Sequence, residues 1–177
     1  MKKGRVIGVA IAALGSLCAI AAPLSAQQRE GINPFAMELL EEHNRARAQV
    51  GVARLQWSNR LTQDAHAWAQ HLAREGRMIH ASREQRSGSG ENLWMGSAGY
   101  YGADTMVGGF LAEQQHFRNG AFPQVSSTGD WRDVGHYTQV IWGNTREVGC
   151  AVARGGSNDF LVCRYWPAGN IYNQRVF

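Results

Sequence analysis

The sequence predicts an α+β domain in which helices cover a mainly antiparallel sheet. Two amphipathic helical patterns, at about residues 34–50 and 59–75, come early in the chain. Two strand-like runs follow near its end, at 148–154 and 159–166, separated by the turn sequence GGSN. Helices followed by antiparallel strands are typical of an α+β fold, because a sheet of this kind buries one face against helices.

The N-terminal segment is predicted to be a secretory signal peptide, residues 1–26. Lys2, Lys3 and Arg5 precede an apolar run over 6–22, and small residues around Ala26 suit a cleavage site. An uncleaved membrane anchor is the alternative, which we disfavour because the run is short for a bilayer span. Residues 27–177 then form a single domain with no transmembrane segment.

Charge argues against a nucleic-acid partner. Three of the 18 basic residues lie before the predicted cleavage site, which leaves 15 arginines against 14 acidic residues in the mature chain. Such a balanced chain has no electrostatic reason to bind nucleic acid. The mature chain also contains no lysine, which excludes Schiff-base chemistry.

The two early helices have clear start and stop signals. Asn33 is placed to cap the first helix, Pro34 suits its first turn and Gly51 ends it. The second helix is expected over 59–75, with Gly76 at its end. The apolar face of the first helix includes a histidine, which we interpret as a core residue; this face comprises Ala36, Leu39, His43, Ala46 and Val50.

Residues 77–102 are polar and glycine-rich and are expected to be irregular. A weaker helix follows, with Asp104 as its cap. Glu113 lies in the middle of its apolar stripe, between Phe110 and Phe117. A carboxylate in such a position needs a partner.

His136 opens a run, Gly135–Cys150, whose apolar residues alternate on both faces. This pattern predicts a strand buried on both sides. A histidine at its start is either a core residue satisfied by a neighbour or half of a site.

Cys150 and Cys163 lie in the two strand-like runs and would face each other in a hairpin. In an exported protein a disulfide is the simplest interpretation. Two free buried thiols are the alternative. A structural zinc site is disfavoured because it would need more thiols.

Four segments are distinctive: HNRARAQVGVARLQWS at 43–58, GENLWMGS at 90–97, GHYTQVIWGNT at 135–145 and FLVCRYWPAGNI at 160–171. Together they resemble the CAP superfamily, which includes cysteine-rich secretory proteins, venom antigen 5 and plant pathogenesis-related protein 1. The resemblance implies a secreted domain with a three-layer α-β-α sandwich. Asn44 and Asn170, within these segments, are expected to tie backbone together.

The resemblance also implies a cleft with two histidines and two glutamates. Carried onto this sequence they are His80, Glu91, Glu113 and His136. Phe110 stands where the family usually has tryptophan. We expect His80 and His136 to bind Zn²⁺ or another divalent cation, with the glutamates orienting bound water. Two protein ligands imply modest affinity that falls as pH drops through the histidine range.

These features predict a secreted or periplasmic monomeric binding protein. Its ligand is expected to be a lipid or sterol, or a cell-surface partner, as the resemblance implies. The alternative is a metal-dependent hydrolase, peptidase-like, in which Glu91 or Glu113 is the catalytic base for zinc-bound water.

Overall fold

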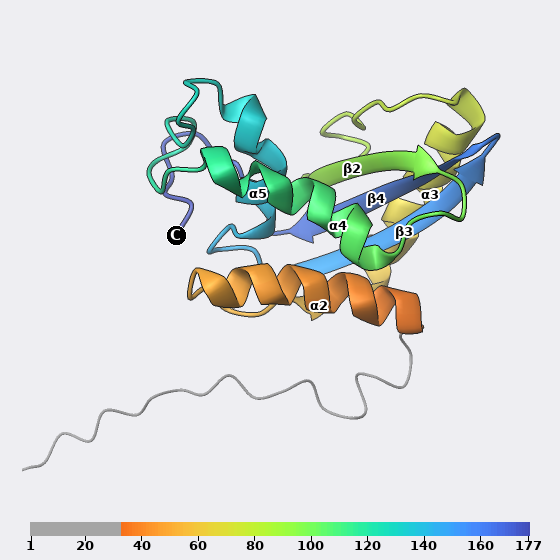
Figure 1. Cartoon of the computed structure of the whole chain (residues 1–177), viewed down its shortest axis with the longest axis horizontal. Helices are drawn as coiled ribbons and strands as arrows, with labels where there is room; N and C mark the ends of the chain where they lie inside the picture. Colours follow the sequence, from red (N-terminus) through yellow and green to blue (C-terminus); the bar gives the residue numbers. More distant parts are fainter. Residues whose placement is uncertain (1–32) are drawn as a thin grey trace, which may run out of the picture.

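The computed structural model describes residues 33–177 and arranges them in three layers (Figure 1). The predicted signal peptide lies outside the described residues. The elements, in chain order, are α2 (Pro34–Gln49), β1 (Gln56–Trp57), α3 (Asn59–Glu75), β2 (Gly90–Ser97), α4 (Ala103–Leu111), the 3-10 helices η1 (Ala112–His116) and η2 (Trp131–Val134), α5 (Gly135–Val140), β3 (Glu147–Gly155) and β4 (Asn158–Trp166).

The four strands form one sheet in the order β1-β3-β4-β2. β4 is antiparallel to both of its neighbours, whereas the two-residue β1 pairs with β3 in parallel. The sheet is therefore mainly antiparallel, as predicted, and β1 adds a short parallel edge that the sequence did not reveal.

Side chains of β4 alternate between two separate apolar clusters. Leu161, Cys163 and Tyr165 pack in the cluster that includes residues of α2, α4 and α5. Phe160 and Val162 pack in the second cluster, with α3. Since successive side chains of a strand point to opposite faces, the sheet is covered on both sides. This confirms the α-β-α sandwich.

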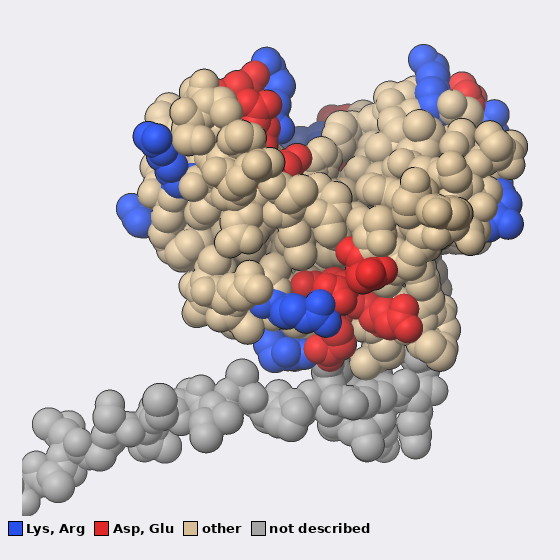
Figure 2. Space-filling view, viewed as in Figure 1, with Lys and Arg blue, Asp and Glu red and all other residues tan. Residues whose placement is uncertain are grey.

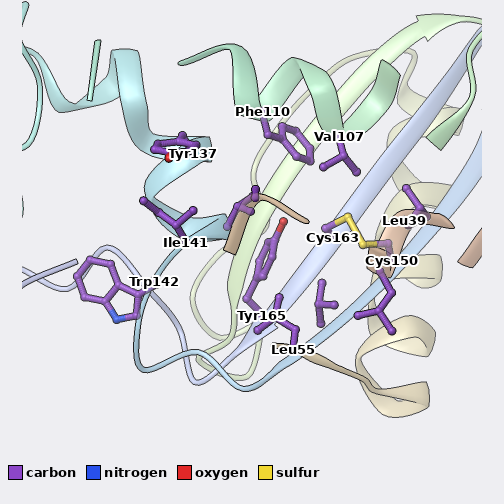
Figure 3. Packing of buried hydrophobic residues seen from close by; sticks show 14 of the residues in the cluster. Leu39, Leu55, Val107, Phe110, Tyr137, Ile141, Trp142, Cys150, Cys163 and Tyr165 are labelled. Atoms are coloured by element: carbon purple, nitrogen blue, oxygen red, sulfur yellow. A yellow bond between two sulfur atoms is a disulfide. The ribbon is translucent and has the colours of Figure 1, made fainter. Parts of the chain in front are cut away.

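The hairpin of β3 and β4 carries a disulfide inside the larger cluster (Figure 3). Cys150 and Cys163 are directly opposite each other in the strand register, and their sulfur atoms are bonded. The disulfide interpretation of the two mature cysteines therefore agrees with the structure.

The start and stop signals of the two early helices are confirmed. The side chain of Asn33 accepts a hydrogen bond from the amide of Ala36 at 2.8 Å, and this begins α2. Gly76 ends α3 in the left-handed conformation, with φ of 67°. Non-glycine residues rarely adopt this conformation, so glycine suits the position.

The strand predicted to begin at His136 is wrong. Gly135–Val140 form the short helix α5, which follows directly on η2. Tyr137, Val140 and Ile141 are all buried and are spaced three and four residues apart, which also suits a helix. A short run that is apolar throughout does not distinguish the two periods.

Two further expectations are corrected. Residues 77–102 are not irregular throughout, because β2 lies within them and pairs along its whole length with β4. The third helix, α4, has Gly102 rather than Asp104 at its cap and ends at Leu111, so Glu113 lies in the following 3-10 helix η1. Asp104 is in the first turn, where a negative charge is favourable.

Within residues 33–177, no helix has the length and apolar character needed to cross a membrane.

Candidate functional site

Glu113 and His136 form a hydrogen-bonded pair at the start of α5. Oε1 of Glu113 lies 2.6 Å from Nδ1 of His136. Oε2 accepts the backbone N–H groups of His136 and Tyr137, at 2.9 and 3.1 Å. These N–H groups are in the first turn of α5, where no intrahelical acceptor exists. The carboxylate therefore satisfies the helix start and orients the imidazole at the same time.

Phe110 completes the support of this imidazole. The two rings are stacked, with centroids 5.3 Å apart and planes 14° from parallel. An aromatic ring at position 110 thus covers one face of His136.

His80, in the segment between α3 and β2, forms a second hydrogen-bonded pair with Glu91 of β2. Oε1 of Glu91 lies 2.7 Å from Nδ1 of His80 and accepts the backbone N–H of Ala81 at 3.1 Å. The side chain of Glu91 is fully buried, whereas that of His80 is 62% exposed. The backbone contact holds the carboxylate beside the loop that carries His80.

Arg164 balances the buried charge of Glu91. The two residues are directly opposite each other on β4 and β2, and Nη1 of Arg164 lies 2.8 Å from Oε2 of Glu91. The contact is an ion pair rather than an aligned hydrogen bond. Burial lowers the pKa of the guanidinium, and the charge of Glu91 opposes this effect. Removing either partner would leave an unpaired buried charge.

Both histidines line one cleft with a volume of about 780 Å³. Figure 2 shows the surface hollowed at its upper edge, between two raised parts of the molecule. Glu91 also lines the cleft, whereas Glu113 lies behind His136 and does not. The walls include large apolar side chains, namely Phe122, Trp131, Ile171 and Tyr172.

The imidazoles of His80 and His136 are held through the same ring atom. Nδ1 of each is engaged by a carboxylate, and in the described part of the chain Nε2 of neither has a protein partner. A carboxylate on Nδ1 favours the tautomer whose Nε2 carries a lone pair, which is the form that ligates metals. The residue type and the support of each histidine therefore suit a metal ligand, with Nε2 as the ligand atom.

A different cluster has three possible ligand atoms within 4.8 Å of one another: His43, Cys150 and Cys163. The sulfur atoms are bonded to each other, so no thiolate is present to ligate a metal. Burial lowers the pKa of His43 to about 4, so it is neutral at physiological pH. His43 is the satisfied core histidine that its helix face predicts. His80, Glu91, Glu113 and His136, the tetrad, form no such three-ligand cluster in the described part of the chain.

Asn44 and Asn170 tie backbone together, as expected. Asn44 donates to the carbonyl of Leu55 and accepts its N–H, at 3.1 and 2.6 Å. Asn170 donates to the carbonyl of Gly135 at 2.8 Å and accepts the hydroxyl of Thr138 at 2.7 Å. The two hydrogen bonds of Asn170 anchor the C-terminal segment to α5 in the lining of the cleft.

The sequence interpretation missed three buried polar residues: Gln139 in the cleft wall, Arg164 beside Glu91, and Arg47 in the core. All three are at most 2% exposed. An available signal for Arg164 was its position inside an otherwise apolar strand, since a charge there requires an opposite charge nearby. Arg47 and Gln139 have mainly backbone partners, which a sequence pattern does not identify.

Comparison with known proteins places the chain in one family. Residues 40–165 match the family model CAP, the cysteine-rich secretory protein family. The chain therefore belongs to the CAP family.

Several plant proteins are similar to it along most of their length. Pathogenesis-related protein 1B of Nicotiana tabacum is 33% identical over 141 residues, which cover 79% of each chain. Pathogenesis-related protein PRMS of Zea mays is 34% identical over 143 residues, which cover 79% of this chain and 81% of the relative. Among solved structures, NaASP2 crystallised with Zn²⁺ superposes with a TM-score of 0.71 at 24% identity, covering 83% of this chain and 87% of that one. The last comparison supports the fold.

Proposed function

We propose that this protein is a secreted binding protein whose cleft holds a divalent metal ion, Zn²⁺ first among them, and a ligand with an apolar body such as a lipid or sterol. The observation that carries the proposal is the shared cleft of His80 and His136. Each has Nδ1 on a buried or half-buried carboxylate and, within residues 33–177, no protein partner for Nε2. Carboxylate–histidine pairs of this kind support metal ligands in proteins generally. NaASP2, which has the same fold, was crystallised with Zn²⁺.

A bound Zn²⁺ would supply Lewis acidity and a site for water or a ligand atom. The residues of this chain would hold the ion and keep the two histidine rings in the orientation that binds it. Glu113 keeps the ring of His136 in one tautomer, and Phe110 prevents the ring from tilting. Glu91 does the same for His80 from β2.

The contacts of the glutamates favour binding over hydrolysis. A general base needs a free carboxylate oxygen that reaches a water in the site. Both oxygens of Glu113 already accept hydrogen bonds, and this residue does not line the cleft. Both oxygens of Glu91 contact His80, Ala81 or Arg164. A peptidase-like reaction would require one of these sets of contacts to break.

Export is part of the proposal. It is supported by the signal-like segment at 1–26, by the disulfide and by membership of a family named for secretory proteins. Disulfides persist mainly outside the reducing cytosol.

Calorimetric titration of metal-free mature protein with Zn²⁺ tests the proposal. The wild type should bind one ion, and His136→Ala should lose specific binding. His66→Ala is the matched control, because His66 is an exposed histidine on α3, away from the cleft, and should leave the titration unchanged. Equal zinc affinity in wild type and His136→Ala would overturn the metal proposal.

A further inference from the structure

A buried amide in the wall of the cleft lacks a partner for its donor atom. Gln139, on α5, is 2% exposed and lines the cleft. Its Oε1 accepts the backbone N–H of Gly169 at 3.0 Å, while its Nε2 has no partner among the described residues. The N–H of Gly169 requires an acceptor, so the orientation of the amide is determined. A buried donor left unpaired is unfavourable.

Two glycines make room for this amide. A Cβ at Gly169 would lie 2.8 Å from Nε2 of Gln139, and a Cβ at Gly90 would overlap its Oε1. Both glycines line the cleft. The amide therefore lies against bare backbone, where a hydrogen-bond acceptor of a ligand could replace the missing partner.

The charged residues of the cleft favour an anion. Arg83, Arg86 and Arg132 line it together with one carboxylate, Glu91. Arg164 balances the charge of Glu91, and Arg132 is paired with Asp130 at 3.0 Å, so Arg83 and Arg86 carry the unbalanced charge. Arg86 donates through Nη1 to the carbonyl of Ser89 at 3.1 Å, but its buried Nε has no partner in residues 33–177. Two unpaired donors, one from Gln139 and one from Arg86, thus belong to the same cleft. A cleft lined by one sign of charge attracts ligands of the other sign.

The remaining wall is aromatic. Phe122 and Tyr172 meet edge to face at 5.4 Å, and Phe122 meets Trp131 at 5.1 Å. Tyr172 is 61% exposed, so it presents apolar surface to an incoming molecule. Ligands of such clefts bury an apolar body and satisfy a few polar groups.

We propose that the ligand of this cleft is a small organic anion, an oxyanion group carried on an aromatic or branched apolar body. The oxyanion accepts hydrogen bonds from Gln139 and Arg86, with Arg83 supplying further positive charge, and the apolar body packs on Phe122, Trp131 and Tyr172. The inference rests on the proposed function in that the cleft binds a ligand. It does not depend on the metal.

The experiment compares a charged probe with its neutral analogue on metal-free mature protein. We expect 4-phenylbutyrate to bind at least about tenfold more tightly than 4-phenylbutanamide, since hydrogen bonds to a charged group are stronger than neutral ones. Phenyl phosphate is tested beside 4-phenylbutyrate. The anion with the higher affinity identifies phosphate or carboxylate as the preferred group.

Two variants and one control assign the effect to the cleft. Gln139→Glu keeps the acceptor for Gly169 but places a negative charge beside the ligand, and Arg86→Gln removes a positive charge. Each should reduce the preference for the anion to about threefold or less. Arg74→Gln removes an exposed arginine of α3 outside the cleft and should leave the preference unchanged. Circular dichroism verifies that each variant is folded.

Equal binding of anion and amide, or no binding of either anion to the wild type, would overturn this inference. An anion preference that survives in both Gln139→Glu and Arg86→Gln would overturn it as well. Zinc titration of the same proteins separates the two proposals. A wild type that binds zinc but shows no anion preference contradicts only the present proposal, and a wild type that prefers the anion but binds no zinc contradicts only the metal proposal.

Discussion

The hydroxyl of Tyr165 lies 2.8 Å from Nε2 of His43 in the core, and the two residues connect α2 to β4. Nδ1 of His43 lies 2.7 Å from the carbonyl of Leu39, which can only accept, so the ring donates there and accepts from Tyr165. Asn92 then donates to the oxygen of Tyr165 at 3.2 Å and to the carbonyl of His136 at 3.0 Å. A buried chain of hydrogen bonds therefore extends from α2 to the residue that presents the cleft imidazole.

Acid should destabilise the protein through His43. Burial, the largest effect, lowers the pKa of His43 from 6.5 to about 4. The unfolded chain therefore binds more protons than the folded one between these values, so this stability is complete above pH 6.5 and is lost as pH falls toward 4. Between pH 7.5 and 5 the wild type should lose about 2 kcal/mol more unfolding free energy than His43→Gln does. Urea unfolding followed by tryptophan fluorescence at both pH values measures the difference.

His66→Gln provides the control for this titration, because His66 is exposed on α3. Its unfolding free energy should change with pH as the wild type does. If His43→Gln also showed the wild-type pH dependence, His43 would not be the group that titrates.

Arg47 should be essential for stability because of its hydrogen bonds to backbone carbonyls. Its guanidinium is fully buried and donates to the carbonyls of Ala53, Val140, Trp142 and Thr145, at 2.6 to 3.1 Å. Burial lowers the pKa of Arg47 to about 10, so it remains charged at neutral pH. Arg47→Met leaves these carbonyls unpaired and should cost at least about 3 kcal/mol of unfolding free energy.

Arg47→Lys should recover only part of this loss, because an ammonium group does not span four carbonyls as the planar guanidinium does. The exposed neighbour in α2 provides the control, and Arg45→Met should change the unfolding free energy by less than about 1 kcal/mol. Urea denaturation compares the three variants. An Arg47→Met protein as stable as the control would show that water replaces the guanidinium.

The parts of the fold that could be predicted from sequence are those with local signals. The cap of Asn33 and the left-handed Gly76 involve neighbours within a few residues, so α2 and α3 were found with their ends. Cys150 and Cys163 are separated by 13 positions across a short turn, which made the hairpin pair visible.

Longer-range relations were not visible in this way. Glu113 contacts His136 across 23 positions, and Glu91 is balanced by Arg164 on another strand. No periodic pattern encodes such pairs, and the four tetrad residues were named through family resemblance. The misassigned α5 has the same cause. Its helical form depends on Glu113, which satisfies its first N–H groups, and on the packing of α4 rather than on its own six residues.

Removing the disulfide should weaken the domain without unfolding it. Cys150→Ala combined with Cys163→Ala opens a loop with a sequence separation of 13. In the chain-entropy model a loop of this size contributes about 3 kcal/mol. The double variant should lose that amount in urea unfolding and keep its circular dichroism spectrum, because both apolar clusters remain. Mass spectrometry of unreduced mature protein should find no alkylatable thiol, and two such thiols would contradict the bond.

Replacing Glu113 by glutamine should lower zinc affinity strongly and the unfolding free energy only slightly. Glutamine keeps the shape and one acceptor oxygen, but it loses the charge that holds Nδ1 of His136 at 2.6 Å. Zinc affinity should fall about tenfold or more, as is typical when a carboxylate behind a metal ligand is removed. The unfolding free energy should fall by only about 1 kcal/mol, since the amide oxygen can still accept one N–H of the helix start. Calorimetry and urea unfolding on one preparation give both values, with Glu38→Gln, an exposed substitution on α2, as the control. Unchanged zinc affinity together with reduced stability would remove Glu113 from the metal site and leave it as the cap of α5.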